Sequence, residues 1–433
     1  MSTDQTATTS ANGTSSIEQS VRDLCRRARR ASREVAQMPD SVRSDALRRA
    51  ATRLRRETDR IVAANELDLK AGLASGLSPA MLDRLRLDAK RVAAIATGLE
   101  TVASLPDPLA NAIDRWNAPS GIDIEQKRIP IGVIGVIYES RPNVTADVAA
   151  LCLKSGNAVV LKGGKEAINT NSVLADIIAE ELVAASVPAD AVALIRSTER
   201  AATEELLRQD DTVDLLIPRG GPGLVRAIAS GSRIPVIKHY EGICHTYVDR
   251  LADLEMATEI AINAKVQRPG VCNSMENLLV HRDVAVDFFA IAAPRLLAEG
   301  VELRGDTATC ALIPEALEAN DEDYRTEYLA LVLAVKVVDS VNEAIEFINE
   351  YGSGHSDAIV TRDDEAAAAF LAGVDSATVY HNASTRFTDG FQFGFGAEVG
   401  ISTNRIHARG PMGLRELTTY KYVIRGSGET VPG

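Results

Sequence analysis

The chain has 433 residues, of which 25% are charged and 45% hydrophobic, and its formal net charge is −13 at pH 7. This composition is typical of a globular protein of two or three domains, and it excludes collagenous, disulfide-scaffold and mostly disordered classes. The negative charge argues against a general affinity for nucleic acid, and no apolar run is long enough to predict a membrane-spanning helix.

The N-terminal residues 1–15 are polar and lack the basic and apolar regions of a signal peptide, so we expect a disordered tail. The five cysteines show neither metal-type spacing nor a paired framework, which indicates a reducing compartment and hence a cytoplasmic protein. Residues 21–60 carry thirteen arginines against six acids. Because apolar residues recur there with helical spacing and no aromatic residues are interleaved, these arginines are interpreted as the solvated face of a helix.

The pattern is helical from about residue 16 to 105 and then changes to strict alternation at 122–128, which is typical of an exposed strand. Such a strand needs a partner to cover its edge, so it is a candidate for self-association. Beyond it, apolar strands alternate with helical stretches. The strands are expected at 131–138, 158–162, 191–195, 214–218 and 235–238. This alternation predicts βαβ units and a parallel, doubly wound sheet of the nucleotide-binding type.

The alternation resumes after about residue 260, which predicts a second α/β domain. Its strands are expected at 276–281, 333–339, 356–361 and 377–382, and a last strand of the chain at 418–425. Cys272 lies near the expected junction of the two domains, where ligand clefts commonly form.

Cys272 follows a Pro-Gly turn in the segment VQRPGVCN and comes shortly after two cations, Lys265 and Arg268. Nearby positive charge lowers the pKa of a thiol and so increases the nucleophilic thiolate, and the turn places the sulfur on an irregular segment. Cys272 is therefore the candidate nucleophile. The other cysteines lie in apolar, β-patterned or amphipathic runs and are expected to be small packed hydrophobes: Cys25, Cys152, Cys244 and Cys310.

Two glycine clusters follow predicted strands, Lys162-Gly163-Gly164-Lys165 and Arg219-Gly220-Gly221. Glycines at the carboxyl end of a parallel strand let backbone N–H groups approach a pyrophosphate. Neither cluster is a full GxGxxG fingerprint, so ordinary tight turns are the alternative for both. Lys162 and Lys165 suit the 2′-phosphate of NADP, where an acid would suit the ribose of NAD, unless they are solvated surface charges.

The segment YESRPNVT, 138–145, also follows a strand end. Arg141 is able to bind a carboxylate or phosphate and Asn143 to donate to an oxyanion, or else Pro142 and Asn143 shape the turn before a helix N-cap at Thr145. Two polar loops, 382–390 and 406–413, hold one arginine each, Arg386 and Arg409. The six histidines have no paired metal spacing, so no catalytic metal is expected.

Several long blocks resemble the gamma-glutamyl phosphate reductases, or glutamate-5-semialdehyde dehydrogenases, of the aldehyde dehydrogenase superfamily. These blocks are VIYESRPNVTADVAALCLKSGNAVVLKGGKEA, LLIPRGG, CHTYVD, NAKVQRPGVCN, ASTRFTDG and HARGPMGLRELTTYKY, between about residues 130 and 422. The resemblance implies an aldehyde dehydrogenase-like α/β fold with a small β oligomerisation flap. It implies a Rossmann-type NADP-binding domain at 16–258, with the oligomerisation strand at about 120–130, a catalytic domain at 259–385, and a segment, 386–433, that returns to the first domain and the flap.

The resemblance also implies an activity: NADPH-dependent reduction of L-glutamate 5-phosphate to glutamate 5-semialdehyde and phosphate, the second step of proline biosynthesis. Cys272 matches the family's nucleophile, Lys162 a position that contacts the cofactor ribose, and Lys165 a position where NAD-preferring relatives carry an acid. Asn143 corresponds to the oxyanion asparagine. Glu241 stands near the water-activating glutamate of hydrolytic relatives, but its flanking sequence differs and we assign it no role. The candidates for binding the substrate carboxylate and phosphate are Arg141, Arg268, Arg386 and Arg409.

The expected partners are the small-molecule substrate, further copies of the chain in a dimer or tetramer, and transiently the glutamate 5-kinase that makes the unstable acyl phosphate. Neither nucleic acid nor membrane is expected as a partner. Two alternatives stay open: a CoA-acylating aldehyde dehydrogenase, which shares the thioester, and a noncatalytic scaffold or thiol redox sensor that uses the same cysteine.

Overall fold

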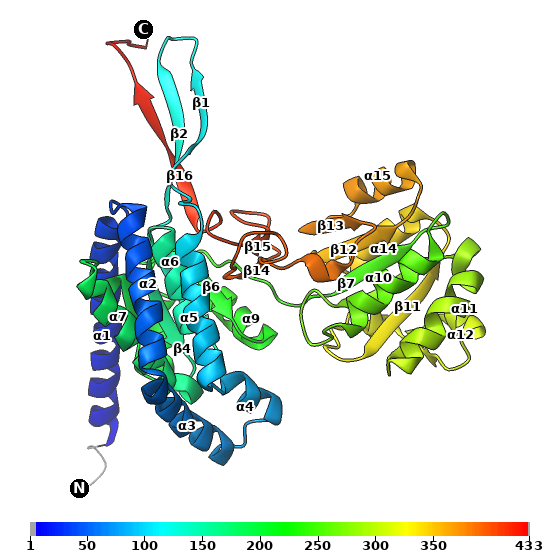
Figure 1. Ribbon diagram of the computed structural model, residues 1–433, viewed down its shortest axis with the longest axis horizontal. Coiled ribbons are helices and arrows are strands. Elements are labelled where there is room, and N and C mark those ends of the chain that lie inside the picture. Colours follow the sequence, from blue (N-terminus) through cyan, green and yellow to red (C-terminus); the bar gives the residue numbers. More distant parts are fainter. Residues whose placement is uncertain (1–5, 432–433) are drawn as a thin grey trace. The chain divides into compact units, whose positions relative to one another are not determined.

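The computed structural model describes residues 6–431 and divides them into two compact units, which are coloured along the sequence in Figure 1. The first unit comprises the described residues up to Lys238, then Phe395–Gly400 and the residues from Met412 onward. The second unit comprises His239–Gly394 and Ile401–Pro411.

Five helices open the first unit, as the sequence predicted for 16–105. They are α1 (Thr6–Val35), α2 (Asp40–Arg56), α3 (Thr58–Ala74), α4 (Pro79–Leu85) and α5 (Ala89–Ser104). Helices α4 and α5 each begin with a side-chain cap. The Ser78 hydroxyl accepts from the Met81 N–H, and the Asp88 carboxylate accepts from the Arg91 N–H. Part of the expected disordered tail, residues 1–5, lies outside the described residues. From Thr6 onward the structure describes the chain as part of helix α1.

A four-stranded parallel sheet in the order β5-β4-β3-β6 forms the centre of the first unit. Its strands are β3 (Val133–Tyr138), β4 (Ala158–Gly163), β5 (Val192–Leu194) and β6 (Leu215–Arg219), and its helices are α6 (Asn143–Lys154), α7 (Ile168–Ala184), α8 (Arg200–Leu206) and α9 (Pro222–Gly231). Helices α1, α8 and α9 pack on one face, and α6 and α7 on the other, with α2 and α5 outside them. The doubly wound prediction is confirmed.

The expected fifth strand, 235–238, makes a single bridge from Val236 to Leu216. Pro235 has no N–H to donate, and the chain enters the second unit directly after Lys238, so no ladder develops.

The strand order reverses at β3, which pairs with β4 on one side and with β6 on the other. Ligands of open parallel sheets bind at such a switch point, beyond the carboxyl ends of the strands. The segments that leave this edge begin at Glu139, Gly164 and Gly220, so the two predicted glycine clusters lie where the topology favours a ligand.

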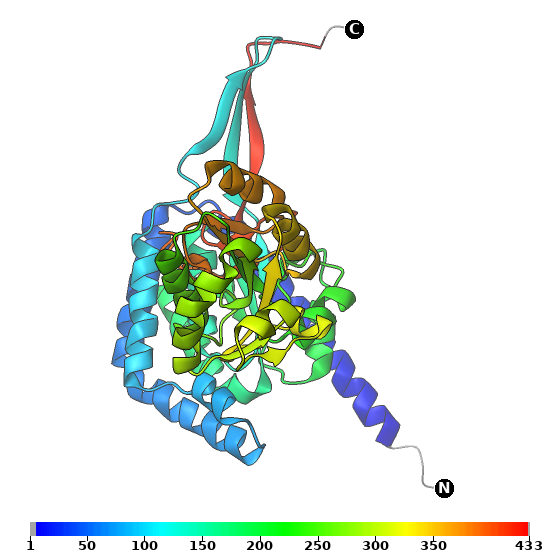
Figure 2. The same ribbon diagram turned by 90° about the vertical axis from the view of Figure 1, so that its right-hand side faces the viewer.

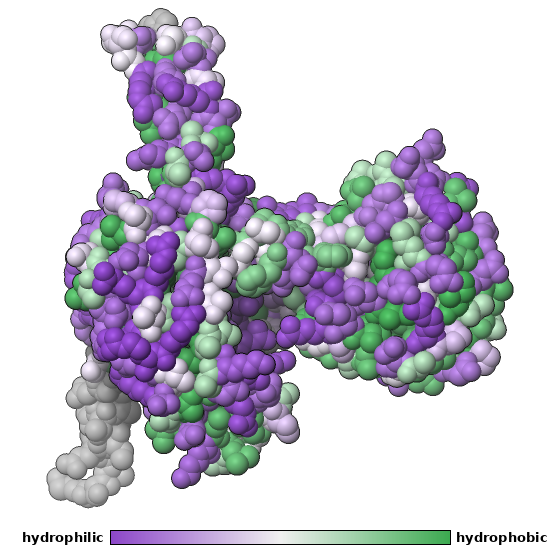
Figure 3. Space-filling view, in the orientation of Figure 1, coloured by the Kyte–Doolittle hydropathy of each residue, from purple (hydrophilic) through white to green (hydrophobic). Residues whose placement is uncertain are grey.

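A three-stranded antiparallel ribbon, the flap, consists of β1 (Ala112–Asn117), β2 (Asp123–Pro130) and β16 (Thr418–Arg425). Figures 1 and 2 show β2 between the other two strands in both views. The predicted strand at 122–128 is confirmed, and its edges are covered by β1 and β16 of the same chain. Hydrophobic residues are interspersed with polar ones on the flap surface in Figure 3, and Trp116 packs edge-on against Tyr422 with ring centroids 6.0 Å apart.

The second unit is built on a seven-stranded parallel sheet in the order β10-β9-β11-β8-β7-β12-β13. Its strands are β7 (Cys244–Val248), β8 (Met275–His281), β9 (Glu302–Gly305), β10 (Leu317–Glu318), β11 (Val332–Val338), β12 (Ser356–Val360) and β13 (Thr378–His381), and its helices are α10 (Leu254–Val266), α11 (Arg282–Ala298), α12 (Thr307–Leu312), α13 (Asp321–Tyr324), α14 (Val341–Tyr351) and α15 (Asp364–Gly373). Helices α10 and α11 cover one face and bury Phe288, and α14 and α15 cover the other and bury Phe347 and Phe370. A second α/β domain was therefore predicted correctly.

The boundary between the units lies about twenty residues earlier than the sequence indicated, because β7 is hydrogen-bonded between β8 and β12. The C-terminal return is also interrupted, since residues 401–411 belong to the second unit. Near these crossings β14 (Gly400–Ser402) pairs with β15 (Gly410–Met412). Among the helices of the described part of the chain, none is long and apolar enough to cross a bilayer.

Candidate active site

Cys272 lies on the irregular segment between the end of α10 at Val266 and the start of β8 at Met275, and its side chain is partly exposed. Cys25, Cys152 and Cys244 are buried, as predicted, and burial raises the pKa of each thiol, to about 12 for Cys25. Cys310 is partly exposed, contrary to the expectation of full packing, because its sulfur lies at the end of α12 beside the Gly305 and Leu317 carbonyl groups. Burial thus distinguishes the unreactive thiols of Cys25, Cys152 and Cys244 from the accessible thiol of Cys272.

The backbone of Cys272 is held by the segment that precedes and begins β7. A Cβ on Gly242 would come within 2.6 Å of the Cys272 Cα and carbonyl carbon, so this position has no room for a side chain. The Cys244 thiol donates to the Cys272 carbonyl oxygen at 3.3 Å. These two contacts fix the backbone of the Cys272 loop and leave the Cys272 side chain to point away from the sheet.

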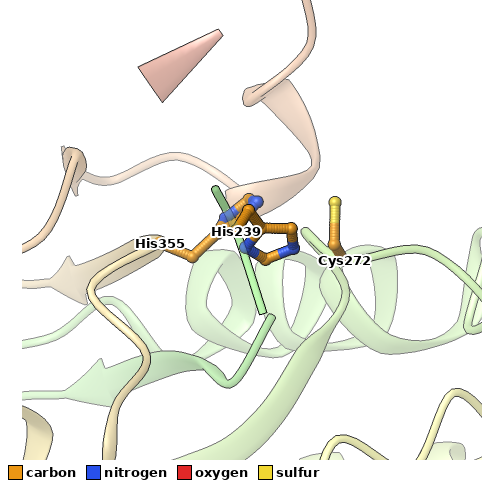
Figure 4. A group of neighbouring side chains, drawn as sticks. All are labelled: His239, Cys272 and His355. Atoms are coloured by element: carbon orange, nitrogen blue, oxygen red, sulfur yellow. The ribbon is translucent and has the colours of Figure 1, made fainter. Parts of the chain in front are cut away.

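Two histidines lie beside Cys272 (Figure 4). One nitrogen of His239, one nitrogen of His355 and the Cys272 Sγ all lie within 4.8 Å of one another. The imidazole rings are tilted, with centroids 5.0 Å apart. His239 precedes β7 and His355 immediately precedes β12, so three separate segments bring these side chains together. The arrangement places proton acceptors within reach of a thiol.

His355 is fully buried, and burial together with His239 holds the pKa of its imidazole well below the usual value. His355 is therefore neutral at physiological pH. Its Nδ1 lies 2.8 Å from the Ser356 hydroxyl, which is 2.6 Å from the Thr388 hydroxyl, and this in turn is 2.8 Å from the Tyr380 hydroxyl. The hydroxyl chain fixes the ring and determines which nitrogen carries the proton.

Asn273 connects the Cys272 loop to the loop that contains Arg386. The Asn273 amide donates to the Thr388 carbonyl oxygen at 2.9 Å, and the Arg386 guanidinium donates to the Asn273 side-chain oxygen. Arg386 also donates to Gln267 at 2.9 Å. Burial and the neighbouring Arg268 lower the pKa of Arg386, whereas Cys272 raises it. The structure thus brings two of the four candidate arginines, Arg386 and Arg268, into the vicinity of the nucleophile.

Lys265 does not lower the pKa of the Cys272 thiol, as the sequence had suggested it would. Its ammonium is fully buried and lies 2.5 Å from the equally buried Glu276 carboxylate on β8. Burial lowers the pKa of Lys265 and raises that of Glu276. Because the lysine charge is compensated by Glu276, the pair holds α10 against β8 instead of activating Cys272.

The other two candidate arginines lie elsewhere. Arg409 donates to the Asp375 carboxylate and carbonyl oxygen, each at 2.9 Å, in an ion pair of the second unit. Arg141 is an exposed residue of the first unit, in the turn between β3 and α6.

The first glycine cluster forms a tight cradle at the end of β4. Lys162 is 6% exposed, its ammonium donates to the Gly163 carbonyl oxygen at 3.0 Å, and burial lowers its pKa. A Cβ on Gly163 would clash with Asn171, and one on Gly164 with Glu166. Lys165 is exposed at the start of the next turn. The nearly buried Lys162 ammonium has donors to spare and so is able to bind a ribose or phosphate oxygen, while the Asn171 and Glu166 side chains lie against the two glycines.

The second glycine cluster is less open. The Glu139 carboxylate accepts from the Gly221 N–H at 3.2 Å, at the N-terminus of α9, and a Cβ on Gly220 would clash with the same carboxylate. Glu139 thus lies where an anion would bind, and the charge of Arg219 only partly offsets the burial that raises the pKa of Asp147. These contacts favour the tight-turn interpretation of Arg219, Gly220 and Gly221.

Asn143 is the first residue of α6, so the helix begins two residues before the expected N-cap at Thr145. Its amide donates to the Asp147 carboxylate at 2.8 Å, one turn along the helix. Burial raises the pKa of Asp147 to about 6. The Thr145 hydroxyl is 2.6 Å from that of Tyr138 and donates to Asn171, which leaves no capping role for it.

Sequence reasoning missed His239, His355 and Gly242. Each histidine is isolated in the sequence, and only the fold places both beside Cys272. The motif KHYEG, 238–242, comes at the end of the predicted strand 235–238 and shortly before β7, and this position beyond a strand end was the available signal for His239 and Gly242.

Comparison with known proteins identifies the family to which the chain belongs. A profile of the Aldehyde dehydrogenase family matches residues 2–316 and 296–423. The gamma-glutamyl phosphate reductase of Geobacter metallireducens is 50% identical over 413 residues, 95% of this chain and 99% of that protein. The gamma-glutamyl phosphate reductase of Moorella thermoacetica is 52% identical over 403 residues, 93% of this chain and 96% of that protein.

The fold is also found in solved structures. The crystal structure of gamma-glutamyl phosphate reductase from Thermotoga maritima matches with a TM-score of 0.93 and 42% identity, covering 95% of this chain and 100% of that one. An acetylating aldehyde dehydrogenase from Geobacillus thermoglucosidasius shares the fold, with a TM-score of 0.67 and 18% identity over 97% of this chain and 99% of that one. Sequence identity over nearly the full length, combined with one shared fold, shows that the chain belongs to the aldehyde dehydrogenase family and, within it, to the gamma-glutamyl phosphate reductases.

Proposed function

We propose that this enzyme reduces L-glutamate 5-phosphate to L-glutamate 5-semialdehyde and phosphate with NADPH, the second step of proline biosynthesis from glutamate. The relatives at 50% and 52% identity carry the corresponding name. The structural observation that carries the proposal is the accessible Cys272, with two imidazoles within 4.8 Å and a guanidinium, Arg386, on the adjoining loop.

Cys272 is the proposed nucleophile. A neighbouring imidazole accepts the thiol proton, and the thiolate attacks the acyl carbon of the substrate. The bond between that carbon and the phosphate oxygen breaks, phosphate leaves with the electron pair, and a thioester of Cys272 forms. Phosphate is a stable leaving anion, so this step needs no general acid with a strongly perturbed pKa. His239 is the better candidate acceptor, because it is only partly buried, whereas burial holds the pKa of His355 well below its usual value and so disfavours its protonation.

Reduction of the thioester completes the reaction. When bound, NADPH supplies the hydride that converts the thioester to a thiohemiacetal. Cleavage of the carbon–sulfur bond then regenerates the Cys272 thiolate, and loss of the hydroxyl proton gives the aldehyde. The backbone N–H of Cys272 is the proposed oxyanion donor of the second unit, and the Asn143 amide of the first unit stays a candidate for the same role; one such donor is worth on the order of 3 kcal/mol. The hydrogen bond from Asn143 to Asp147 fixes the orientation of that amide.

The proposed cofactor site is the cradle of Lys162, Gly163, Gly164 and Lys165. Lys162 suits a ribose hydroxyl because its ammonium is nearly buried, and Lys165 suits the 2′-phosphate of NADP because it is exposed and cationic. We assign Arg219, Gly220 and Gly221 a supporting role at the switch point, where Glu139 accepts from the Gly221 N–H.

Among the substrate-binding candidates, Arg386 has the strongest support, because it is half-buried and its charge interacts with Cys272. Arg268 is exposed, and its charge lowers the pKa of Arg386. It therefore suits the phosphate group of the substrate. Arg409 is held by Asp375, and Arg141 lies beyond β3 in the first unit; both stay candidates for the substrate carboxylate.

The test is the reverse reaction, in which glutamate 5-semialdehyde, phosphate and NADP give NADPH. We expect turnover to require phosphate stoichiometrically, and Cys272→Ala to lower kcat/KM at least about 1,000-fold because covalent catalysis is lost. Cys310→Ala, at another partly exposed thiol, is the matched control and keeps activity. Phosphate-independent turnover that requires CoA would instead support the acylating alternative, and full activity of Cys272→Ala the scaffold.

The flap is the proposed oligomerisation surface. Its large exposed aromatic and aliphatic residues are Ile113, Trp116, Tyr420, Tyr422 and Ile424, between 40% and 59% exposed. An exposed apolar ribbon with two uncovered edges favours association with further copies of the chain as a dimer or tetramer. Tyr422→Glu is expected to shift the sedimentation coefficient toward that of the monomer, whereas Val286→Glu on α11 is not. Equal sedimentation of both variants and the wild type would show that the flap is not the surface through which the chains associate.

A transient association with glutamate 5-kinase follows from the instability of the acyl phosphate, which is best transferred without release. Co-sedimentation of the two enzymes would support it, and independent sedimentation at tens of micromolar would count against it. A cytoplasmic location agrees with the cysteines, because within the described residues they form no disulfide.

A further inference from the structure

The cluster of Cys272, His239 and His355 has the composition of a metal site as well as that of a catalytic centre (Figure 4). One thiol and two imidazoles, all with ligand atoms within 4.8 Å of one another, come from three separate segments of the second unit. We propose that these three side chains bind one Zn²⁺ ion, and that the bound ion reversibly masks the Cys272 nucleophile. The proposal concerns this cluster alone and holds whichever acyl substrate the enzyme uses.

His355 is the observation that points to a ligand. It is fully buried, and its Nε2 has no hydrogen-bond partner within the described part of the chain. A buried polar nitrogen of this kind costs free energy unless it is paired. Its other nitrogen, Nδ1, is 2.8 Å from the Ser356 hydroxyl, so a proton on Nδ1 leaves the Nε2 lone pair available to a ligand.

The surroundings of His355 resemble the outer shell of a metal ligand. Metal-binding histidines usually donate their second N–H to a neighbouring oxygen, which fixes the tautomer and the ring. Here the Ser356, Thr388 and Tyr380 hydroxyls form such a chain behind Nδ1. Burial keeps the imidazole neutral, and a neutral imidazole is the form that coordinates a metal.

The distances suit tetrahedral zinc after small side-chain rotations. Ideal Zn–S and Zn–N bonds place the ligand atoms roughly 3.3 to 3.6 Å apart. The observed limit of 4.8 Å exceeds this by about 1 Å, which side-chain rotations can close. Three protein ligands leave a fourth position for water or for a substrate carboxylate. The soft thiolate and two imidazoles select Zn²⁺ over the oxygen-seeking Mg²⁺ and Ca²⁺.

The chemistry of binding explains the masking. The Cys272 thiol gives up its proton to solvent, and its sulfur lone pair forms the bond to zinc, with no change of oxidation state. A zinc-bound thiolate is a weaker nucleophile than the released one, so neither the acyl substrate nor an alkylating agent reacts with it. Arg386 and Arg268 place positive charge near the cluster and oppose a cation, which favours binding weak enough to be reversed by a chelator.

Alkylation of the thiol by iodoacetamide tests the proposal without any turnover. In the wild-type full chain, one equivalent of Zn²⁺ is expected to slow Cys272 alkylation at least about tenfold, measured by peptide mass spectrometry. EDTA restores the original rate. Alkylation of Cys310, the internal control, is unchanged. Equal rates at Cys272 with and without Zn²⁺ would overturn the proposal.

Two variants separate the cluster from nonspecific metal binding. His355→Gln is expected to reduce the protection of Cys272 to less than about twofold, whereas His381→Gln on β13, a matched histidine outside the cluster, keeps it. The comparison uses the ratio of rates with and without Zn²⁺, so a change in basal thiol reactivity does not affect it. Full protection in His355→Gln would show that the histidine is no ligand.

Co²⁺ provides a readout on the unmodified protein if a histidine variant fails to fold. One equivalent is expected to give a thiolate-to-cobalt charge-transfer band in the near ultraviolet and tetrahedral bands in the visible. Cys310→Ser keeps these bands, and Cys272→Ser abolishes the charge-transfer band. Bands that survive in Cys272→Ser would place the metal elsewhere. Failure of the proposed reaction, by contrast, leaves all of these outcomes unaffected.

Discussion

Gly242 lies directly against the backbone of Cys272, and a Cβ at residue 242 would come within 2.6 Å of the Cys272 Cα. The clash is with backbone, so no side-chain rotation relieves it. Gly242→Ala is therefore expected to displace the nucleophile loop by up to about 1 Å and to lower kcat/KM about 100-fold. Steady-state kinetics of the reverse reaction measure this loss.

The matched control is Gly98→Ala in α5, where an added Cβ meets the Asp147 carboxylate at an ordinary 3.8 Å. This variant is expected to keep full activity and to gain a few tenths of a kcal/mol in helix stability. If Gly242→Ala were as active as Gly98→Ala, the position of the Cys272 backbone would not be critical for catalysis.

The buried pair of Lys265 and Glu276 leads to a prediction about stability. Lys265→Met removes one partner and leaves the Glu276 carboxylate buried alone, which is expected to lower the free energy of unfolding by about 3 to 5 kcal/mol. The double variant Lys265→Met, Glu276→Leu is expected to recover most of the loss, because no charge is then buried. Urea unfolding followed by circular dichroism measures both.

An exposed ion pair serves as the reference for that experiment. Asp339→Asn removes the exposed partner of Arg282 and is expected to cost less than about 1 kcal/mol. A loss for Lys265→Met no larger than that for Asp339→Asn would mean that Glu276 is protonated or solvated without its lysine.

Asp147 predicts a pH dependence of stability. Burial raises the pKa of this carboxyl to about 6, above its unfolded value, so between about pH 4 and pH 6 the folded chain holds a proton that the unfolded chain has lost. Stability due to this group is therefore present below pH 4 and is lost as the pH rises through 6. Asp147→Asn does not ionise, so its free energy of unfolding relative to wild type should increase by about 2 kcal/mol from pH 4 to pH 7. A difference that stays constant across this range would contradict the raised pKa.

The charge of Lys165 leads to a prediction about the preference for NADP over NAD. Lys165→Glu places a carboxylate where the 2′-phosphate of NADP is proposed to bind, and kcat/KM for NADP is expected to fall at least about 30-fold by repulsion while that for NAD stays within about threefold. Lys165→Gln removes the charge without adding repulsion and is expected to give an intermediate loss. Equal losses for both cofactors would show that Lys165 does not contact the 2′-phosphate.

Much of the fold could be predicted because the sequence of a strand or helix, and of the turns beside it, largely determines where that element forms. The strands from 131 to 218 are continuous apolar runs, and helices α7 and α9 follow the two glycine clusters at strand ends, so the order of the elements was correct. Strand β7 was not among the predicted strands, and its membership in the second sheet depends on hydrogen bonds to β8 and β12. Those partners lie far along the chain, and no local pattern identifies them.

The site could be predicted only in part for the same reason. Cys272 and the lysine-glycine cluster stand out in the sequence, because a turn and a strand end determine their surroundings. His239 and His355 lie more than one hundred residues apart, and Lys265 has a charge whose partner, Glu276, depends on the pairing of a helix with a strand. Tertiary contacts decide the role of each of these residues.

The chain passes between the two units at residues 238, 394, 400 and 411, and β16 pairs with β2 from almost the opposite end of the sequence. Neither unit is therefore encoded by one continuous stretch of gene. A ribosome that has translated the first three hundred codons has produced a flap in which one edge of β2 is still bare, and that edge can be covered only after the codons for residues 418–425 are read. Synthesis of β16, not emergence of the first half of the chain, is thus the event that allows the first unit to become complete.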